Sequence, residues 1–252
     1  MTQNLVLGID IGGSGIKGAV VDLTTGQLVG ERLRIETPAE STPQNVAGVV
    51  GEIVNAFADQ IGDGPIGLTI PAVVTHGRTR SAANIDPSWI DAPAQQIFEQ
   101  ALGRGVVLVN DADAAGFAEV KFGAAKDNPG LVIVTTLGTG IGSAMIYRGM
   151  LIPNSELGHL EIDGYDAEKR AAASIRTKEG LSYDEYVPRL QRYYETVEML
   201  FWPDLLVVGG GVSKKADKFL PKLKLKTPIV AATLKNEAGI IGAAFLAVEG
   251  AA

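Results

Sequence analysis

The sequence of 252 residues contains no cysteine and only two histidines, and its net charge is −7. The absence of cysteine excludes disulfides and thiolate metal sites, and it is typical of a cytoplasmic protein, which we expect this one to be. No apolar run approaches the roughly 20 residues that span a bilayer, and no signal peptide is expected at the N-terminus. The acidic balance argues against non-specific binding of nucleic acid.

A hydrophobic content of 46% and the chain length predict one large domain or two small ones. Each half opens with two apolar runs separated by glycines, residues 5–11 and 15–22 in the first half and residues 131–137 and 141–147 in the second. This echo indicates a duplicated fold without a repeated sequence. With no Pro- or Ser-rich linker present, we expect an N-terminal lobe at 1–110 and a C-terminal lobe at 111–252, packed around a cleft.

Mixed α/β structure is expected in both halves, because helical periodicity alternates with short buried strands. Helices are predicted over 43–61, 94–102, 111–122, 166–175, 182–201, from Lys214 onward and over 237–248. Further strands are predicted over 28–35 and 229–230, and buried strands over 66–70, 106–109 and 205–208.

The first glycine loop follows the strand at residues 5–11. Asp10 lies near the end of this strand, and Gly12, Gly13 and Ser14 follow it. Glycines let backbone N–H groups approach a phosphate closely, and the serine adds a hydroxyl donor. Carboxylate, glycines and hydroxyl in this order suit a metal-bound phosphate.

Two similar loops follow later strands, at residues 137–142 and 207–212. One such loop alone is usually a tight turn, and the glycines at 209–211 would also serve close strand–helix packing. Three loops together favour phosphoryl transfer, and the phosphate-binding candidates are Gly12, Gly13, Ser14, Gly138, Thr139, Gly140, Gly210 and Gly211.

A dinucleotide-binding oxidoreductase is the competing interpretation, because residues 13–18 match the spacing of its glycine motif and Glu36 follows at a suitable distance. That motif must open a helix. Residues 16–23 instead alternate like a strand and run into a turn at Thr25-Gly26, so we reject this interpretation.

Polar side chains suited to sugar chemistry lie between the glycine loops. Asn110 and Asp111 follow a buried strand, so one could cap the next helix while the other accepts a proton from a substrate hydroxyl. Glu156 and His159 suit sugar hydroxyls better than a metal, since there are no cysteines and no second such pair. Asn84 alone indicates only a turn.

Taken in order, these motifs resemble the ROK family of repressors, open reading frames and sugar kinases, and within it the actinobacterial branch that phosphorylates glucose with polyphosphate. The resemblance rests on residues 10–14, 110–111, 137–142, 156–159 and 209–211 and spans nearly the whole chain. It implies an actin-like ATPase fold of two ribonuclease-H-like lobes with mixed sheets around a cleft that holds the sugar. It also implies a homodimer.

The resemblance implies a role for each matching residue. Asp111 matches the catalytic base, and Asp10 matches the residue that organises Mg²⁺ through water. The residues that match sugar ligands are Asn84, Asn110, Glu156 and His159, with Glu168 completing the sugar site. The chain departs from the family in three ways. It lacks the cysteine-rich zinc motif after His159, has Pro71-Ala72 where relatives have Pro-Gly, and has no room before Leu5 for a DNA-binding helix-turn-helix.

The donor is expected to be inorganic polyphosphate. Six lysines, Lys214, Lys215, Lys218, Lys222, Lys224 and Lys226, fall within 13 residues after the last glycine loop, with Asp217 the only acid among them. Such a run is often a solvated helix face, but a track of flexible cations suits a long polyanion, and we assign Lys214, Lys215 and Lys218 to phosphate binding. An ATP-dependent hexokinase acting on glucose or mannose and a non-catalytic sugar sensor are the alternatives.

Overall fold

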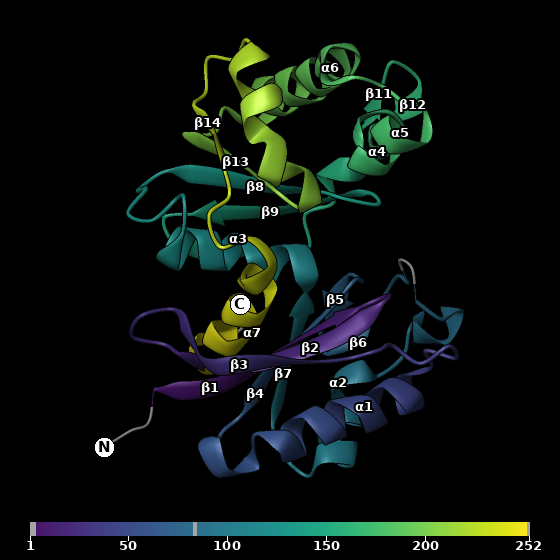
Figure 1. Ribbon diagram of the computed structural model, residues 1–252, viewed down its shortest axis with the longest axis vertical. Helices are drawn as coiled ribbons and strands as arrows, with labels where there is room; N and C mark the ends of the chain where they lie inside the picture. Colours follow the sequence, from purple (N-terminus) through teal and green to yellow (C-terminus); the bar gives the residue numbers. More distant parts are fainter. Residues whose placement is uncertain (1–3, 83–84, 251–252) are drawn as a thin grey trace. The chain divides into compact units, whose positions relative to one another are not determined.

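The computed structural model describes residues 4–82 and 85–250. The chain forms two compact units, one of residues Met1–Ala118 with Glu237–Ala252, the other of residues Glu119–Asn236 (Figure 1). These limits differ from the expected division at 110/111. The helix after Asn110 runs on into the second unit, and the C-terminal helix returns to the first unit, where it packs on strands of the N-terminal sheet. Among the described residues, no helix has the length and apolar character needed to cross a membrane.

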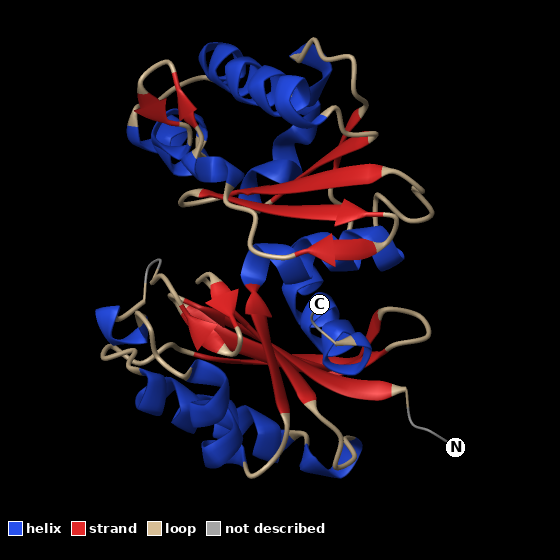
Figure 2. Ribbon diagram, turned by 180° about the vertical axis from the view of Figure 1, so that it is seen from behind, coloured by secondary structure: helices blue, strands red, loops and turns tan. Residues whose placement is uncertain are grey.

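The first unit is built on a five-stranded sheet of order β3-β2-β1-β4-β7 (Figure 2). Its strands are β1 (Leu5–Gly12), β2 (Gly15–Asp22), β3 (Gln27–Ile35), β4 (Ile66–Ile70) and β7 (Val106–Asn110). β1, β2 and β3 pair antiparallel, whereas β4 pairs parallel with both β1 and β7. The small hairpin β5 (Val74–Thr75) and β6 (Arg78–Thr79) lies outside this sheet.

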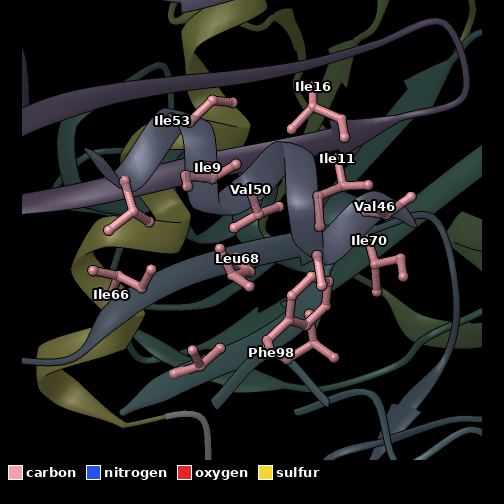
Figure 3. Close-up of a cluster of buried hydrophobic side chains, with 14 of the residues drawn as sticks. Ile9, Ile11, Ile16, Val46, Val50, Ile53, Ile66, Leu68, Ile70 and Phe98 are labelled. Atoms are coloured by element: carbon pink, nitrogen blue, oxygen red, sulfur yellow. The ribbon is translucent and has the colours of Figure 1, made fainter. Parts of the chain in front are cut away.

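Helices cover both faces of this sheet. α1 (Pro43–Ala56) and α2 (Ala94–Leu102) pack on one face, and α7 (Ala238–Glu249) packs on β1 and β4 from the other (Figure 1). Side chains alternate along a strand, so Ile9 and Ile11 join the core beneath α1 and α2, together with Phe98 (Figure 3). The side chain of Asp10, between these isoleucines, therefore points to the face of the sheet that α7 covers.

The second unit repeats the same strand arrangement in the order β10-β9-β8-β13-β14. Its strands are β8 (Leu131–Leu137), β9 (Ile141–Tyr147), β10 (Met150–Ile152), β13 (Leu205–Gly209) and β14 (Ile229–Ala231). Three antiparallel strands are again followed by two parallel ones. The duplicated fold expected from the two glycine hairpins is therefore confirmed.

Short elements surround the second sheet. β11 (Glu161–Ile162) and β12 (Tyr165–Asp166) form a separate hairpin that leads into α4 (Glu168–Ala171), α5 (Ala173–Lys178) and α6 (Tyr183–Phe201). α6 begins with a capping box between Ser182 and Glu185. α3 (Asp111–Phe122) joins the two units.

Three helix predictions need correction. The first helix ends at Ala56, not at residue 61, and the helix expected over 166–175 is a strand followed by two short helices. The helix expected from Lys214 is a 3₁₀ segment, Gly211–Lys218, interrupted by a non-helical φ of −123° at Lys215. A second 3₁₀ turn over Leu220–Lys222 contains a proline, which cannot extend a regular helix.

Candidate active site

In the first unit, the glycine loop is the tip of the β1–β2 hairpin. Gly12 pairs with Gly15, so Gly13 and Ser14 form a two-residue turn, and both are exposed. The Thr37 hydroxyl donates to the Gly12 carbonyl at 2.5 Å and Arg34 donates to the Ser14 carbonyl at 2.8 Å. The expected strand–glycine–strand hairpin is confirmed, and residues 15–22 are a strand, which removes the dinucleotide interpretation.

Asp10 lies on β1, three residues before Gly13, with a side chain that is 21% exposed. Its Oδ1 accepts a hydrogen bond from the Thr69 hydroxyl at 2.9 Å, and its Oδ2 lies 3.3 Å from the Lys17 Nζ. Lys17 was missed in the sequence analysis, although a two-residue turn at 13–14 pairs position 10 with position 17. The carboxylate is held in place while part of it still faces solvent, a setting in which Mg²⁺ can bind through its own waters.

Asn110 and Asp111 lie where β7 passes into α3. The Asn110 Oδ1 accepts from the N–H groups of Ala112 at 2.8 Å and Asp113 at 3.1 Å, and its Nδ2 donates to the Ala72 carbonyl at 3.1 Å. Asn110 therefore takes the capping role that the sequence had left open between the two residues. Asp111 begins the helix and is half-buried, and its Oδ1 accepts from the Ala112 N–H at 2.8 Å.

In the second unit, Glu156, His159 and Glu168 lie close together. The His159 Nε2 is 4.0 Å from the Glu156 Oε2, and on the other side of the ring Nδ1 is 3.0 Å from the Asp166 Oδ2. The Glu168 Oε2 accepts from the backbone N–H of Ile141 at 3.1 Å. Ligand atoms of His159, Asp166 and Glu168 all lie within 4.8 Å of one another, close enough to share a cation.

Two residues of this cluster, Glu156 and His159, have pKa values raised above their ordinary range. Burial, and then the negative charge of Glu168, raise the pKa of Glu156, against the opposing effect of His159. The hydrogen bond to Asp166 raises the pKa of His159 most strongly, and the charges of Glu168, Asp166 and Glu156 add to this against partial desolvation. An imidazole and carboxylates in this arrangement can donate and accept hydrogen bonds with several neighbouring hydroxyls.

The two glycine loops of the second unit contact each other. Gly210 has a φ of +78°, and a Cβ on it would lie 2.4 Å from the carbonyl oxygen of Leu137, where the loop at 138–140 begins. Ser174 holds that loop, because its N–H donates to the Gly138 carbonyl at 3.0 Å and its hydroxyl donates to the Thr139 carbonyl at 2.6 Å. A Cβ on Gly140 would lie 2.2 Å from the Glu168 Oε2. The backbone of this loop therefore lies directly against the carboxylate cluster.

The lysine-rich segment begins directly after these loops. Lys214, Lys215 and Lys218 are all exposed. The Lys218 ammonium lies 5.7 Å from the centroid of the Tyr183 ring. Further along, Lys222 forms an ion pair with Asp184, and the Lys226 ammonium lies 5.1 Å from the centroid of the Trp202 ring. Of the six lysines, Lys222 alone has a carboxylate at ion-pair distance in the described part of the chain, so the three cations nearest the glycine loops have no neutralising carboxylate there.

One candidate site residue, Asn84, lies outside the described residues. The others fall into two groups, one in each unit: Asp10, Gly12, Gly13, Ser14, Asn110 and Asp111 in the first, and Gly138, Thr139, Gly140, Glu156, His159, Glu168, Gly210, Gly211, Lys214, Lys215 and Lys218 in the second. The residues that sequence reasoning missed are Lys17, Thr69, Asp166 and Ser174, each of which contacts a candidate residue or its loop.

The chain is similar to known proteins in both sequence and structure. The model of the ROK family matches residues 6–174. A polyphosphate glucokinase of Mycobacterium tuberculosis is 51% identical over 248 residues, which cover 98% of this chain and 92% of that protein.

Among solved structures, an inorganic polyphosphate/ATP-glucomannokinase from Arthrobacter sp. strain KM is similar with a TM-score of 0.92 at 52% identity, covering 97% of this chain and 98% of that one. A ROK family glucokinase from Streptomyces griseus, in complex with glucose and AMPPNP, has a TM-score of 0.83 at 24% identity, covering 98% and 100% of the two chains. These neighbours confirm the expected actin-like ATPase fold.

Proposed function

This chain belongs to the ROK family, and from that premise we propose that it transfers the terminal phosphoryl group of inorganic polyphosphate to the 6-hydroxyl of glucose, giving glucose 6-phosphate. The observation that carries the proposal is the near full-length similarity, above 50% identity, to two proteins named for polyphosphate as donor. We include the cytoplasmic location expected from the cysteine-free sequence in the proposal, and the homodimer stays a prediction.

In this proposal, Asp111 is the general base. Its carboxylate accepts the proton of the glucose 6-hydroxyl as that oxygen attacks the terminal phosphorus atom in line, and the bond from that phosphorus to the bridging oxygen breaks, releasing a polyphosphate one unit shorter. The assignment is supported by the division of roles at the start of α3, where the Asn110 side chain caps the helix and is itself held by the Ala72 carbonyl. Asn110, only 8% exposed, would contribute to the sugar site mainly by fixing the backbone at Asp111.

Glucose hydroxyls are assigned to Glu156, His159 and Glu168. Sugars offer hydroxyl groups that both donate and accept, and carboxylates accept while an imidazole can do either. The closeness of the three side chains supports the assignment, as does the partial burial that raises the pKa of Glu156. Asn84 stays a candidate by its motif alone.

Phosphoryl-transfer enzymes of this kind use a divalent metal with the donor, and we propose Mg²⁺. The residue that would hold it is Asp10, whose hard oxygen ligands suit Mg²⁺ and whose orientation Thr69 and Lys17 fix. The ion would neutralise charge on the transferred group. The N–H groups of the exposed Gly13–Ser14 turn and of the loop at 138–140 would bind the phosphate oxygens.

Polyphosphate is assigned to the segment that begins with Lys214, Lys215 and Lys218. These exposed ammonium groups follow the glycine loop at Gly210, so a chain of phosphates held at that loop would continue along them. Binding that neutralises several phosphates releases condensed counterions and should weaken steeply with salt, by analogy with nucleic acids. ATP is the second candidate donor, because the Arthrobacter neighbour is named for both polyphosphate and ATP, and mannose a second sugar for the same reason.

The test is a donor panel with glucose and Mg²⁺, in which glucose 6-phosphate is measured with polyphosphate, ATP and GTP. We expect polyphosphate to be preferred. Replacing Lys214, Lys215 and Lys218 with alanine should raise the KM for long polyphosphate far more than the KM for glucose. The matched control replaces Lys222, Lys224 and Lys226, which lie further along and two of which already have an acidic or aromatic neighbour.

Preference for ATP in the wild type would make the enzyme a nucleotide-dependent hexokinase of the same fold. Equal effects of the two triple variants on the polyphosphate KM would contradict a track that starts at the glycine loop. Absence of glucose 6-phosphate with every donor would leave the sugar-sensor alternative.

A further inference from the structure

The imidazole of His159 is held at Nδ1, the ring nitrogen on the side away from Glu156. Its Nδ1 lies 3.0 Å from the Asp166 Oδ2, whereas its Nε2 faces Glu156 at 4.0 Å. The His159 side chain is 57% exposed and the Asp166 side chain 25%. A ring that is more than half exposed is free to rotate unless a partner holds it, and at Nδ1 that partner is Asp166.

Asp166 is itself on a rigid support. It lies on β12, which pairs with β11 across a turn of Asp163 and Gly164. Both turn residues have positive φ values, 53° and 78°, as a tight two-residue hairpin requires. Just beyond β12, the N–H of Ala167 donates to the Leu160 carbonyl at 2.9 Å. The position of the Asp166 backbone is therefore fixed relative to the segment that carries His159.

Contacts outside the pair also restrain the hairpin and the carboxylate. Asp163 accepts two hydrogen bonds from Arg192 of α6, at 2.9 Å and 2.7 Å. The second oxygen of Asp166, Oδ1, accepts from the N–H of Glu168 at 3.3 Å. Both carboxylate oxygens are thus engaged, one with the imidazole and one with the first residue of α4. That residue is Glu168, another proposed sugar ligand, so Asp166 connects two members of the site.

A carboxylate facing Nδ1 determines the chemistry of the opposite nitrogen. It can only accept, so Nδ1 must carry a proton and, in the neutral ring, Nε2 keeps its lone pair. Nε2 then accepts a hydrogen bond from a sugar hydroxyl, while Glu156 beside it accepts another. In the protonated ring both nitrogens donate, and the plane of the ring stays the same.

We propose that Asp166 is a positioning residue for glucose binding, which acts by fixing the tautomer and the ring orientation of His159. The inference rests on the proposed function, since it takes His159 to bind the sugar. Asp166 does not itself touch the substrate in this role. Groups that orient a ligand imidazole in this way are worth about 10–100-fold in binding or activity in metal sites, where the effect is known best.

The first test is kinetic. Asp166→Ala should raise the KM for glucose about 10-fold or more, with the KM for polyphosphate within about 2-fold of the wild type. Asp166→Asn should recover part of the loss, because the amide oxygen can still accept from Nδ1. The control is Asp163→Asn on the same hairpin, which removes a charge that contacts Arg192 rather than His159 and keeps a residue suited to the positive φ.

A double-variant cycle separates positioning from a general structural effect. If Asp166 acts through His159, then Asp166→Ala should change the glucose KM by less than about 2-fold in a His159→Ala background. An equal effect in both backgrounds would mean that Asp166 acts through something else and would overturn the proposal. A glucose KM within 2-fold of the wild type in Asp166→Ala would overturn it as well.

The second test does not depend on turnover. The chain has two histidines, His76 and His159, so long-range ¹H–¹⁵N spectra of the imidazoles can be assigned with a single His159→Ala sample. We expect neutral wild-type His159 to carry its proton on Nδ1, and Asp166→Ala to shift it toward the Nε2–H form that predominates in free histidine. A wild-type ring with its proton on Nε2 would contradict the proposal. A wild type that phosphorylates no glucose would refute the proposed function, whereas the spectra would still decide the tautomer.

Discussion

Replacing Gly140 with alanine is expected to disturb the sugar site through Glu168. A Cβ at this position would lie 2.2 Å from the Glu168 Oε2 and 3.2 Å from its Cδ. Real Cβ contacts essentially never fall below 3.0 Å, so the carboxylate oxygen must move by at least 3.0 − 2.2 = 0.8 Å. Gly138, two residues earlier, is the control, because a Cβ there meets nothing within 4 Å. Neither glycine has a positive φ, so alanine fits the backbone at both.

The size of the effect follows from the bond that the displaced carboxylate makes. The Glu168 Oε2 accepts from the Ile141 N–H at 3.1 Å, and Ile141 is only 2% exposed. Leaving a buried N–H without its partner costs about 1–3 kcal/mol in the free energy of unfolding. If Glu168 also binds a glucose hydroxyl, losing a hydrogen bond to a charged group, worth about 1.5–3 kcal/mol, should raise the glucose KM about 10-fold or more.

The assay pairs urea unfolding with steady-state kinetics on the wild type, Gly140→Ala and Gly138→Ala. We expect both the free energy of unfolding and the glucose KM to change in Gly140→Ala and neither to change much in Gly138→Ala. A Gly140→Ala variant with wild-type stability and wild-type glucose KM would show that the carboxylate of Glu168 is not displaced, contrary to this prediction. A Gly140→Ala variant that is less stable but keeps its glucose KM would mean that Glu168 does not bind the sugar. Its lower stability would then be explained by the lost hydrogen bond between Glu168 and Ile141.

Three further predictions concern the base, the metal and the pH response. Asp111→Asn should lower turnover by at least about 10²-fold with little change in glucose affinity; retained turnover would return Asp111 to a purely structural role. The purified protein should contain no stoichiometric zinc by mass spectrometry, and its activity should survive a zinc-selective chelator. Because Asp166 raises the pKa of His159, their pair should stabilise the fold fully below about pH 6.5 and lose this contribution as pH rises through the folded-state pKa. Urea unfolding of wild type and Asp166→Asn should therefore differ more at pH 5.5 than at pH 9.

Local signals were sufficient where one strand or one turn decides the structure. The β1–β2 and β8–β9 hairpins were predictable because alternating apolar residues bracket their glycines, and α3 because Asn110 and Asp111 follow a buried strand. The phosphate-binding candidates follow from these loops. Their roles depend on the family resemblance, because a single glycine turn does not distinguish a phosphate-binding loop from an ordinary tight turn.

Contacts between distant or oppositely directed segments were not predictable in the same way. The helix expected over 166–175 hid Asp166 as the partner of His159, although Asp163-Gly164 is itself a hairpin signal. The helix expected from Lys214 is instead a 3₁₀ segment, which the non-helical φ at Lys215 interrupts. The two compact units have other limits than 110/111, because α3 continues past Asn110 and α7 packs on β1 and β4 from the C-terminal end of the chain.

In the proposed reaction, the terminal phosphoryl group of polyphosphate is transferred to the 6-hydroxyl of glucose. The most direct test is ³¹P NMR of the purified protein with long-chain polyphosphate, glucose and Mg²⁺, with the Asp111→Asn variant as a parallel sample. We expect a phosphomonoester signal of glucose 6-phosphate to grow in the wild type, matched by shortening of the polyphosphate, and to grow at least about 10²-fold more slowly in the variant. Release of orthophosphate without glucose 6-phosphate, or phosphorylation only after ATP replaces polyphosphate, would contradict the proposed reaction.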